Sequence, residues 1–443
     1  MPSPLKSPRL RRILVAFTVN RLGTWVGLVA LSLAVFDHTH SALAVAALLF
    51  AWQALPAFLV PAVVARVESS ARGGELSGRY IVEAVATAGL AVLLWHFWLP
   101  AVLVLAVLDG TAALAANALL RSEVARVARD QVEGRAGGMA QADESGETNA
   151  QEAERKANAA LNVAASVAFV AGPLFGGAVV AAAGAPAALF IDVGSFLICG
   201  GLLIDLHPHV ELAAEDSVRA RLRAAWTHIN ETPLLRGLLL TEAFALVFIQ
   251  AGGPIEVAYA KATLHAGDRG YGLLVTAWGA GAVLASVIFA RSLRRPLGAM
   301  LSAGIFALGA AFVGFALAPS LGLACVASLV GGIGNGLEWP SLISLVQRMT
   351  PQHLHGRLMG AVESLGALCL AIGLPLGGAL VAVSSTRVAF LVVGLGAMGS
   401  TVAFVRLMLI GLEPRTEGSQ GIPATLDSSQ PVIGPLSHES TPK

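Results

Sequence analysis

Twelve long apolar stretches constrain what this 443-residue chain can fold into more than any other feature of its sequence. A helix needs roughly 20 apolar residues to cross about 30 Å of hydrocarbon, because each residue adds about 1.5 Å to its length. The stretches of this kind are residues 12–36, 42–65, 79–97, 99–120, 157–182, 186–206, 235–259, 270–290, 297–318, 320–346, 358–383 and 387–411. They predict an all-α membrane protein with 12 transmembrane helices.

The basic residues sort by side when these stretches are numbered as consecutive spans. Only Lys261, Arg269 and Arg387 fall in loops opposite the N-terminus, and Arg21 and Arg406 lie inside spans. All other Lys and Arg residues fall on the N-terminal side. Because cytoplasmic loops carry an excess of Lys and Arg, this distribution predicts that both termini are cytoplasmic.

Composition agrees with a membrane protein and excludes other classes. The chain is 56% hydrophobic and only 13% charged, far from a soluble domain of this length. Its basic residues stand beside predicted helix ends and form no aromatic-rich patch, so we expect no nucleic-acid partner. The cysteines lack metal or disulfide spacing, and the chain has no catalytic nucleophile motif or phosphate-binding loop. We therefore expect neither an enzyme nor an ATP-driven pump, and no cofactor or metal.

Two glycine- and proline-containing motifs indicate an internal repeat. They occupy residues 172–177 in the fifth span and residues 373–378 in the eleventh. Glycines four residues apart allow close helix packing, which makes these residues candidates for packing and gating. The candidates are Gly172, Pro173, Gly176, Gly177, Pro375, Gly377 and Gly378. Similar motifs in the fifth span of each half are typical of a transporter with two six-helix halves.

The repeat predicts how the chain divides into domains. Residues 1–206 form one six-helix bundle and residues 234–411 form the other. The first bundle carries an acidic cytoplasmic insertion, residues 130–155, whose composition predicts a flexible segment. Residues 207–233 are a cytoplasmic linker with Val218, Leu222, Ala225 and Ile229 at helical spacing, which predicts a surface helix. Residues 412–443 are expected to be a disordered cytoplasmic tail.

Several short motifs resemble those of a known transporter family in their order and spacing. They are Asn20-Arg21-Leu22-Gly23-Thr24, Thr39-His40-Ser41-Ala42, Ala157-Asn158-Ala159-Ala160-Leu161 with the 172–177 motif, Phe190-Ile191-Asp192, Tyr271-Gly272-Leu273-Leu274 and Gly356-Arg357. With these motifs the chain resembles the drug-efflux branch of the major facilitator superfamily, which includes macrolide and enterobactin exporters. The resemblance implies two six-helix bundles around a central cavity, in a monomer of the bacterial cytoplasmic (inner) membrane.

One family motif has no counterpart. The family usually carries a G-x-x-x-D-R motif between spans 2 and 3, where the Asp helps to close the cytoplasmic side. This chain has no Asp-Arg pair at residues 61–68, and Glu68 is the available acidic substitute. The resemblance therefore implies a closing latch and proton coupling less strongly than it implies the fold.

Asp109 and Arg21 are the leading candidates for proton coupling. An ionised side chain in hydrocarbon costs about 2.5–3.5 kcal/mol on insertion scales, so such residues face a cavity or a partner. Asp109 lies near the middle of span 4, on a face that continues through small residues to Asn117. Arg21 lies at a similar depth in span 1. The pair has two interpretations, a proton site that responds to the approach of Arg21 or a static ion pair between spans 1 and 4.

Other polar residues inside the spans are candidates for the cavity wall or for coupling. Span 7 presents Glu242, Gln250 and Glu256 along one side, and the alternative is that the two glutamates are hydrated at the helix ends. Asn335 and Glu338 share a face of span 10, and Glu363 lies about two turns into span 11. Hydration or a link to Arg348 or Arg357 is the alternative for these glutamates. Asn20 and Asn117 are assigned to the cavity wall.

The sequence and the resemblance together predict a secondary exporter. Its partners would be protons, the lipid bilayer and a hydrophobic or amphiphilic small molecule, such as a drug or a siderophore-like compound. One alternative is a lysophospholipid or lipid flippase of the same superfamily. Another, from a different class, is a membrane receptor or scaffold that transports nothing.

Overall fold

The computed structural model is helical throughout the residues it describes, which are 8–59, 75–136, 144–204, 218–291, 295–351 and 354–412. The elements are α1 (Pro8–Thr39), α2 (Ala42–Leu49), η2 (Phe50–Ala54), α4 (Glu75–Leu93), α5 (Leu99–Ala136), α6 (Glu144–Leu202), α7 (Val218–Glu231), α8 (Pro233–Ala258), η3 (Tyr259–Thr263), α9 (Gly267–Arg291), α10 (Leu297–Leu317), α11 (Leu321–Arg348), α12 (His355–Val383) and α13 (Thr386–Leu412). The π-helical turns η2 and η3 continue α2 and α8 directly.

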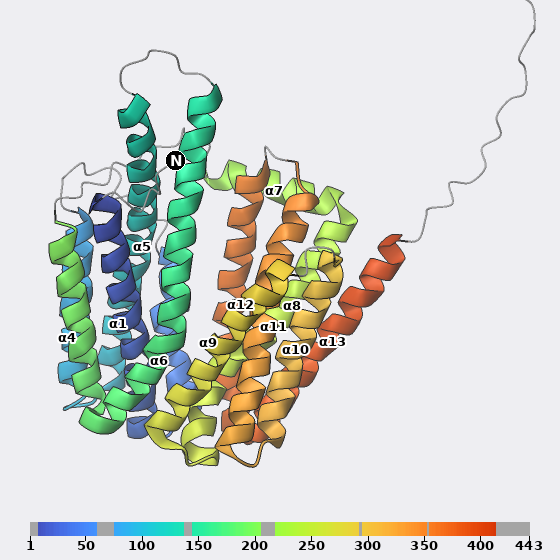
Figure 1. Ribbon diagram of the computed structural model, residues 1–443. Coiled ribbons are helices and arrows are strands. Elements are labelled where there is room, and N and C mark those ends of the chain that lie inside the picture. The colour runs from blue at the N-terminus through green and yellow to red at the C-terminus, as the bar shows by residue number, and fades with distance from the viewer. Residues whose placement is uncertain are drawn as a thin grey trace, which may run out of the picture.

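Within the described ranges, 11 segments are long and apolar enough to cross a membrane. The prediction of 12 differs at one place, because the fifth and sixth predicted spans form the single element α6, with a candidate span of Ala159–Leu202. The backbone leaves helical geometry at Gly184, with φ 82° and ψ 165°, and the chain reverses there (Figure 1). Glycine adopts a positive φ without steric cost, so a very short turn separates the two arms.

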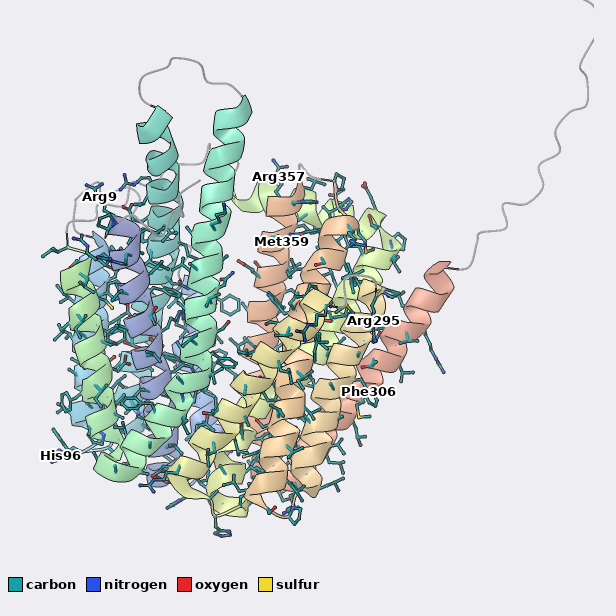
Figure 2. All side chains as sticks on the ribbon, viewed as in Figure 1. Arg9, His96, Arg295, Phe306, Arg357 and Met359 are labelled. Atoms are coloured by element: carbon teal, nitrogen blue, oxygen red, sulfur yellow. The ribbon has the colours of Figure 1, made fainter. Side chains whose placement is uncertain are left out.

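The helices form two bundles that stand side by side (Figure 1). Elements α1 to α6 make the N-terminal bundle, α8 to α13 make the C-terminal bundle, and α7 crosses one end of the latter. We call this end of the molecule the α7 end and the opposite one the far end. Arg9 and Arg357 lie at the α7 end, and His96 lies at the far end (Figure 2).

The apolar core shows where the bundles join. One cluster of buried residues at the far end combines side chains of both bundles, among them Leu48 and Leu90 with Tyr259 and Phe390. Nearer the α7 end the core divides into two clusters. One contains only N-terminal residues such as Phe17, and the other contains only residues of α7 and the C-terminal bundle. Packed apolar surface therefore joins the bundles at the far end and separates into two cores toward the α7 end.

The glycine motifs of the two halves make equivalent contacts. Gly172 and Gly176 of α6 abut α1, and Gly373 and Gly377 of α12 abut α8, so these four pack inside their own bundles. The last glycine of each motif faces the other bundle. A Cβ on Gly177 would lie 2.8 Å from the backbone oxygen of Asp268 in α9, and a Cβ on Gly378 would lie 2.9 Å from the Cα of Leu43 in α2. The motifs thus occupy matching positions in two pseudo-equivalent halves.

Pro173 and Pro375 lie inside the same two helices, next to these contacts. The carbonyl oxygen of Pro173 would lie 2.8 Å from a Cβ on Gly272, so this backbone also reaches the other bundle. The helical geometry of α6 is broken only at Gly184 among its described residues. The structure therefore holds an unbroken helix at Pro173, and a gating role for either proline stays a prediction.

For the segments outside the spans, the structure agrees with one prediction and differs from another. The predicted surface helix exists as α7, and its Ala225 and Ile229 are buried against the C-terminal bundle. The predicted flexible insertion is instead helical where it is described, because α5 extends to Ala136 and α6 begins at Glu144. Its Ala, Glu, Gln and Arg residues are strong helix formers, which explains the extension of both helices. The predicted tail lies outside the described residues beyond Leu412, as does the loop that contains Glu68.

Candidate functional site

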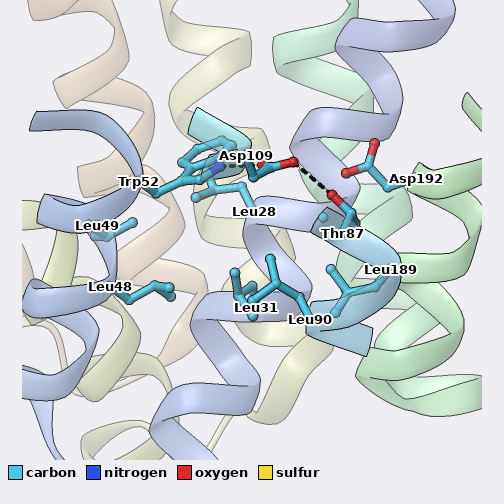
Figure 3. Close-up of a pocket in the computed structure, with 11 residues that line it drawn as sticks. Leu28, Leu31, Leu48, Leu49, Trp52, Thr87, Leu90, Asp109, Leu189 and Asp192 are labelled. Atoms are coloured by element: carbon cyan, nitrogen blue, oxygen red, sulfur yellow. Dashed lines mark hydrogen bonds between the residues drawn. The ribbon is translucent and has the colours of Figure 1, made fainter. Parts of the chain in front are cut away.

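Asp109 lies at the centre of a small chamber inside the N-terminal bundle (Figure 3). Trp52 Nε1 in η2 donates to Asp109 Oδ2 at 2.7 Å, and Thr87 Oγ1 in α4 donates to Oδ1 at 2.9 Å. The neighbouring residue Gly110 makes this approach possible, because any Cβ there would overlap the backbone oxygen of Trp52. The chamber holds about 20 Å³, which is room for about one water molecule. Asp109 is therefore a buried, hydrogen-bonded carboxyl and does not line a substrate-sized space.

A second carboxyl, Asp192 of α6, lines the same chamber (Figure 3). It accepts a hydrogen bond from Ser195 Oγ at 3.2 Å and is buried against α1 at Gly23 and Gly27. A Cβ at either glycine would overlap the Asp192 carboxyl, so these small residues of α1 create its space. In the sequence, Asp192 stands out only as the last residue of the Phe190-Ile191-Asp192 motif. The glycines at 23 and 27 were the available signal, because they leave room on α1 for a polar side chain.

The predicted pairing of Arg21 with Asp109 is absent, although both residues are described. Arg21 stacks on the ring of Phe17 with 5.3 Å between its Cζ and the ring centroid, and its electrostatic carboxyl neighbour is Glu83 of α4. Glu83 is fully buried and interacts electrostatically with Asp109 and Asp192. Glu83 lies only about two turns from the start of α4, but its face of the helix packs into the bundle. The N-terminal bundle thus buries three neighbouring carboxyls and one guanidinium.

A larger cavity of about 540 Å³ lies between the two bundles. Ala57, Ser166 and Phe169 of the N-terminal bundle contribute one wall, and residues of α8, α9, α11 and α12 contribute the other. Three predicted site residues line it, namely Gln250, Asn335 and Glu338. Most of its other lining side chains are apolar, and Trp339 is the largest. A mostly apolar cavity with few polar groups is suited to hydrophobic small molecules.

Glu338 at the edge of this cavity meets a second buried glutamate, Glu242 of α8. Both side chains are almost fully buried, and the two carboxyl groups are neighbours that interact electrostatically. No N–H or O–H donor from the described residues reaches either oxygen of Glu242. Two carboxylates offer only acceptors, so a hydrogen bond between them would need a proton on one of them. Neither predicted alternative, hydration or a link to Arg348 or Arg357, describes this pair.

The remaining predicted residues lie apart from the cavity wall. Glu256 is buried toward Tyr271 of α9 and Cys325 of α11, near the far end. Asn20 Nδ2 and Asn117 Oδ1 are buried in the N-terminal bundle without a hydrogen-bond partner among the described residues. Glu363 is exposed on α12, one turn from the lining residue Ala367. The three polar residues of span 7 therefore lie in different places. Glu242 belongs to the glutamate pair, Gln250 lines the cavity, and Glu256 faces the C-terminal core.

A charged contact joins the bundles at the far end, which sequence reasoning did not anticipate. Lys261 Nζ lies 2.8 Å from Asp37 Oδ1 at the end of α1 and 2.6 Å from Asp268 Oδ1 in the first turn of α9. Lys261 and Asp268 belong to the C-terminal bundle, whereas Asp37 belongs to the N-terminal one. The lysine was recognised only as one of the few basic residues on this side. We call these three residues the far-end ion cluster.

Comparisons with known proteins identify relatives of this chain. The family model described as Major Facilitator Superfamily matches residues 243–439. A Bacillus subtilis strain 168 protein described as the uncharacterized MFS-type transporter YfiS is 29% identical over 237 residues, 50% of this chain and 56% of that protein. The multidrug efflux pump Tap of Mycolicibacterium fortuitum is 25% identical over 258 residues, 54% of this chain and 60% of that protein. The matches thus span a little over half the length of these relatives.

Solved structures resemble the whole fold. The nucleoside transporter NupG superposes with a TM-score of 0.71 at 12% identity, covering 91% of this chain and 99% of that one. A bacterial homologue of the iron transporter ferroportin, in an inward-facing state, gives 0.66 at 16% identity, with 91% and 99% covered. At these identities the likeness concerns the fold alone. The relatives and neighbours are transporters and not enzymes, and the match to the family model agrees with the expected family.

Proposed function

We propose that this chain, which belongs to the major facilitator superfamily, exports hydrophobic or amphiphilic small molecules in exchange for protons. We place it in the cytoplasmic membrane of a bacterium as a monomer with both termini inside. Its multidrug efflux relative supports the substrate class. The basic residues support the orientation, because Arg79, Arg236 and Arg348 stand at helix ends on the α7 side. Counting the two arms of α6 separately supports 12 spans.

The transport proposal rests on one observation. A cavity lies between the bundles, and the bundles are in contact with each other at the far end. Both bundles line the cavity, and its polar groups are few. On the far side of it, Gly177 and Gly378 bring the bundles into backbone contact, and the far-end ion cluster adds charge attraction. Breaking these contacts while closing the α7 end would expose the cavity to the other side. Rocking of two repeats around a fixed cavity is the movement that such a repeat architecture favours.

Proton coupling rests on the buried carboxyls. Glu338 lines the cavity, and a hydrogen bond between it and its neighbour Glu242 would need a proton on one of the two carboxyls. A substrate or a conformational change that separates the two side chains would alter the number of protons they bind. The Asp109 chamber lies inside the N-terminal bundle and has no opening to this cavity among its lining residues. We therefore assign substrate-linked proton exchange to the glutamate pair and a supporting role to Asp109.

Transport in proteoliposomes tests this assignment. A fluorescent lipophilic cation should be moved against its gradient under an imposed pH gradient, and a protonophore should abolish the movement. Glu338→Gln at matched protein content should uncouple or stop it, while Glu363→Gln, a change at an exposed site on α12, should leave it unchanged. Unchanged movement in Glu338→Gln would remove the glutamate pair from coupling. Failure of the wild type with a varied panel of cations and neutral amphiphiles would remove the export proposal.

The same vesicles separate the two alternatives. Movement of a fluorescent lysophospholipid between leaflets without movement of the dyes would favour the lipid flippase. A purified protein that moves neither class of molecule would favour a receptor or scaffold.

A further inference from the structure

A second large cavity, of about 620 Å³, lies where α7 crosses the C-terminal bundle. Its walls come from α7, α8 and α12, so it is separate from the cavity between the bundles. Its polar lining residues are Arg236, Asn230 and Ser364, and leucines of α8 and α12 supply most of the remaining wall. This combination is suited to a molecule with one polar and one apolar end.

Two stripes of side chains make the cavity polar at one end and apolar at the other. On α8, Arg236, Leu240 and Phe244 follow one another at intervals of four residues, as Ser364, Leu368 and Ile372 do on α12. Residues four apart share a helix face, and both helices start at the α7 end. Each stripe is therefore polar near that end and apolar deeper in the membrane. The four apolar side chains are 49–65% exposed, so neighbouring helices leave much of their surface uncovered.

Arg236 supplies an uncompensated charge at the mouth of the cavity. The residue is exposed, and its guanidinium forms no ion pair or hydrogen bond with any other described residue. None of the acidic residues of α7, α8 and α12 belongs to the cavity wall, namely Glu231, Glu242, Glu256 and Glu363. A cation in this position attracts an anionic head group.

Helix α7 places this mouth at the membrane surface. Its exposed Trp226 lines the cavity beside Asn230, and Ala225 and Ile229 hold the helix against the bundle. Tryptophan is enriched at the level of lipid head groups, and basic pockets between membrane helices bind lipid head groups. The membrane supplies such molecules at high concentration from the side.

We propose that this cavity binds an anionic phospholipid from the leaflet on the α7 side. The lipid phosphate pairs with Arg236 and accepts a hydrogen bond from Asn230, whereas the Ser364 hydroxyl donates to Gly360 O and only adds polarity to the wall. One acyl chain lies between the stripes that continue through Leu240 and Leu368. The bound lipid ties α7 to α8 and α12, and so stabilises the junction between the linker and the C-terminal bundle.

Native mass spectrometry of the purified full-length chain tests the proposal. The probes are phosphatidylglycerol and phosphatidylcholine with identical acyl chains. We expect phosphatidylglycerol to bind about fivefold or more tightly than phosphatidylcholine, and Arg236→Gln to remove that preference. The matched control is Arg291→Gln, because Arg291 is exposed at the end of α9 on the same side but outside this cavity. Melting of the lipid-free variants checks that both fold as the wild type does.

The apolar half of the site has its own variant. Ala361→Phe places a large ring in the cavity and should weaken both lipids without changing their ratio. Equal binding of the two lipids by the wild type, or an unchanged preference in Arg236→Gln, would overturn the proposal. Competition by glycerophosphoglycerol, which has the head group but no acyl chain, at the same concentration as the lipid would also overturn it. None of these results depends on transport, so they stand apart from the export assay.

Discussion

The two bundles share one helix arrangement but differ in the hydrogen-bond donors that they offer to their buried carboxyls. In the N-terminal bundle Asp109 receives hydrogen bonds from Trp52 and Thr87 in a chamber of water size. In the C-terminal bundle Glu242 and Glu338 receive none from an N–H or O–H donor and meet each other at the edge of the central cavity. Donors stabilise a carboxylate, whereas two carboxyls can hydrogen-bond to each other only when one of them carries a proton. The two halves therefore share a packing framework but differ in the surroundings of their buried carboxyls.

The largest effect is expected where the two halves are alike, at Gly177 and Gly378. Gly177→Ala and Gly378→Ala should each open the far end, because the new Cβ would lie 2.8 Å from Asp268 O and from Ala46 Cβ respectively. Overpacking of this kind costs about 1–3 kcal/mol. Labelling of Thr263→Cys, beside the seal, by a membrane-impermeant maleimide should accelerate in both variants.

Gly194→Ala and Gly399→Ala are the matched controls, because nothing lies within 4 Å of a Cβ at either position. An effect at Gly177 without one at Gly378 would show that only one half of the repeat contributes to the seal.

The next largest effect is expected at Asp109. Asp109→Asn replaces an acceptor oxygen by an NH₂ group, so one of the donors, Trp52 Nε1 or the Thr87 hydroxyl, loses its partner. An unsatisfied buried donor costs about 1–3 kcal/mol, and the variant should be destabilised by this amount. Thermal unfolding of the detergent-purified protein measures it. Trp52→Phe removes the 2.7 Å hydrogen bond while keeping an aromatic ring, and a wild-type melting temperature in both variants would contradict the role of these bonds.

A smaller effect is expected at the far-end ion cluster. Lys261→Met removes the contact between the bundles at Asp37 and leaves Asp268 without its cation. Partly exposed ion pairs contribute about 1 kcal/mol or less, so the population open at the far end should rise by up to about fivefold. The same maleimide labelling measures the change. The control is Arg269→Gln, because Arg269 is an exposed neighbour outside the cluster, and this variant should behave as the wild type. Equal labelling of both variants would show that the far-end ion cluster does not hold the far end closed.

The smallest effect on stability is expected at the glutamate pair, which makes it the sharpest contrast with Asp109. In Glu242→Gln the amide N–H can donate to Glu338, so the pair gains a donor that needs no proton. The free energy of unfolding should change by less than about 1 kcal/mol, or rise. Glu338→Gln should behave alike in the same unfolding measurement. A loss as large as that of Asp109→Asn would mean that both bundles hold their carboxyls in the same way.

Local sequence patterns predicted the helices and the repeat because these depend on residues close together in the chain. The apolar runs located the spans within a few residues, and Ala225 with Ile229 predicted the buried face of α7. The two glycine motifs predicted equivalent positions in the two halves. The exception, residues 130–155, was misread because acidity was given more weight than the helix propensity of the same residues.

By itself, the sequence determined an all-helical membrane protein with two related halves, since hydrophobic length and spacing decide that outcome in lipid. Only the tertiary structure decided the partners of the buried polar residues. Asp109 meets Trp52 and Thr87, which lie 57 and 22 residues away, and Glu242 meets Glu338 on another helix. Such pairs depend on how helices rotate and pack against one another. No periodicity along a single helix records that rotation, so the sequence placed Arg21 beside Asp109 while packing placed it beside Glu83.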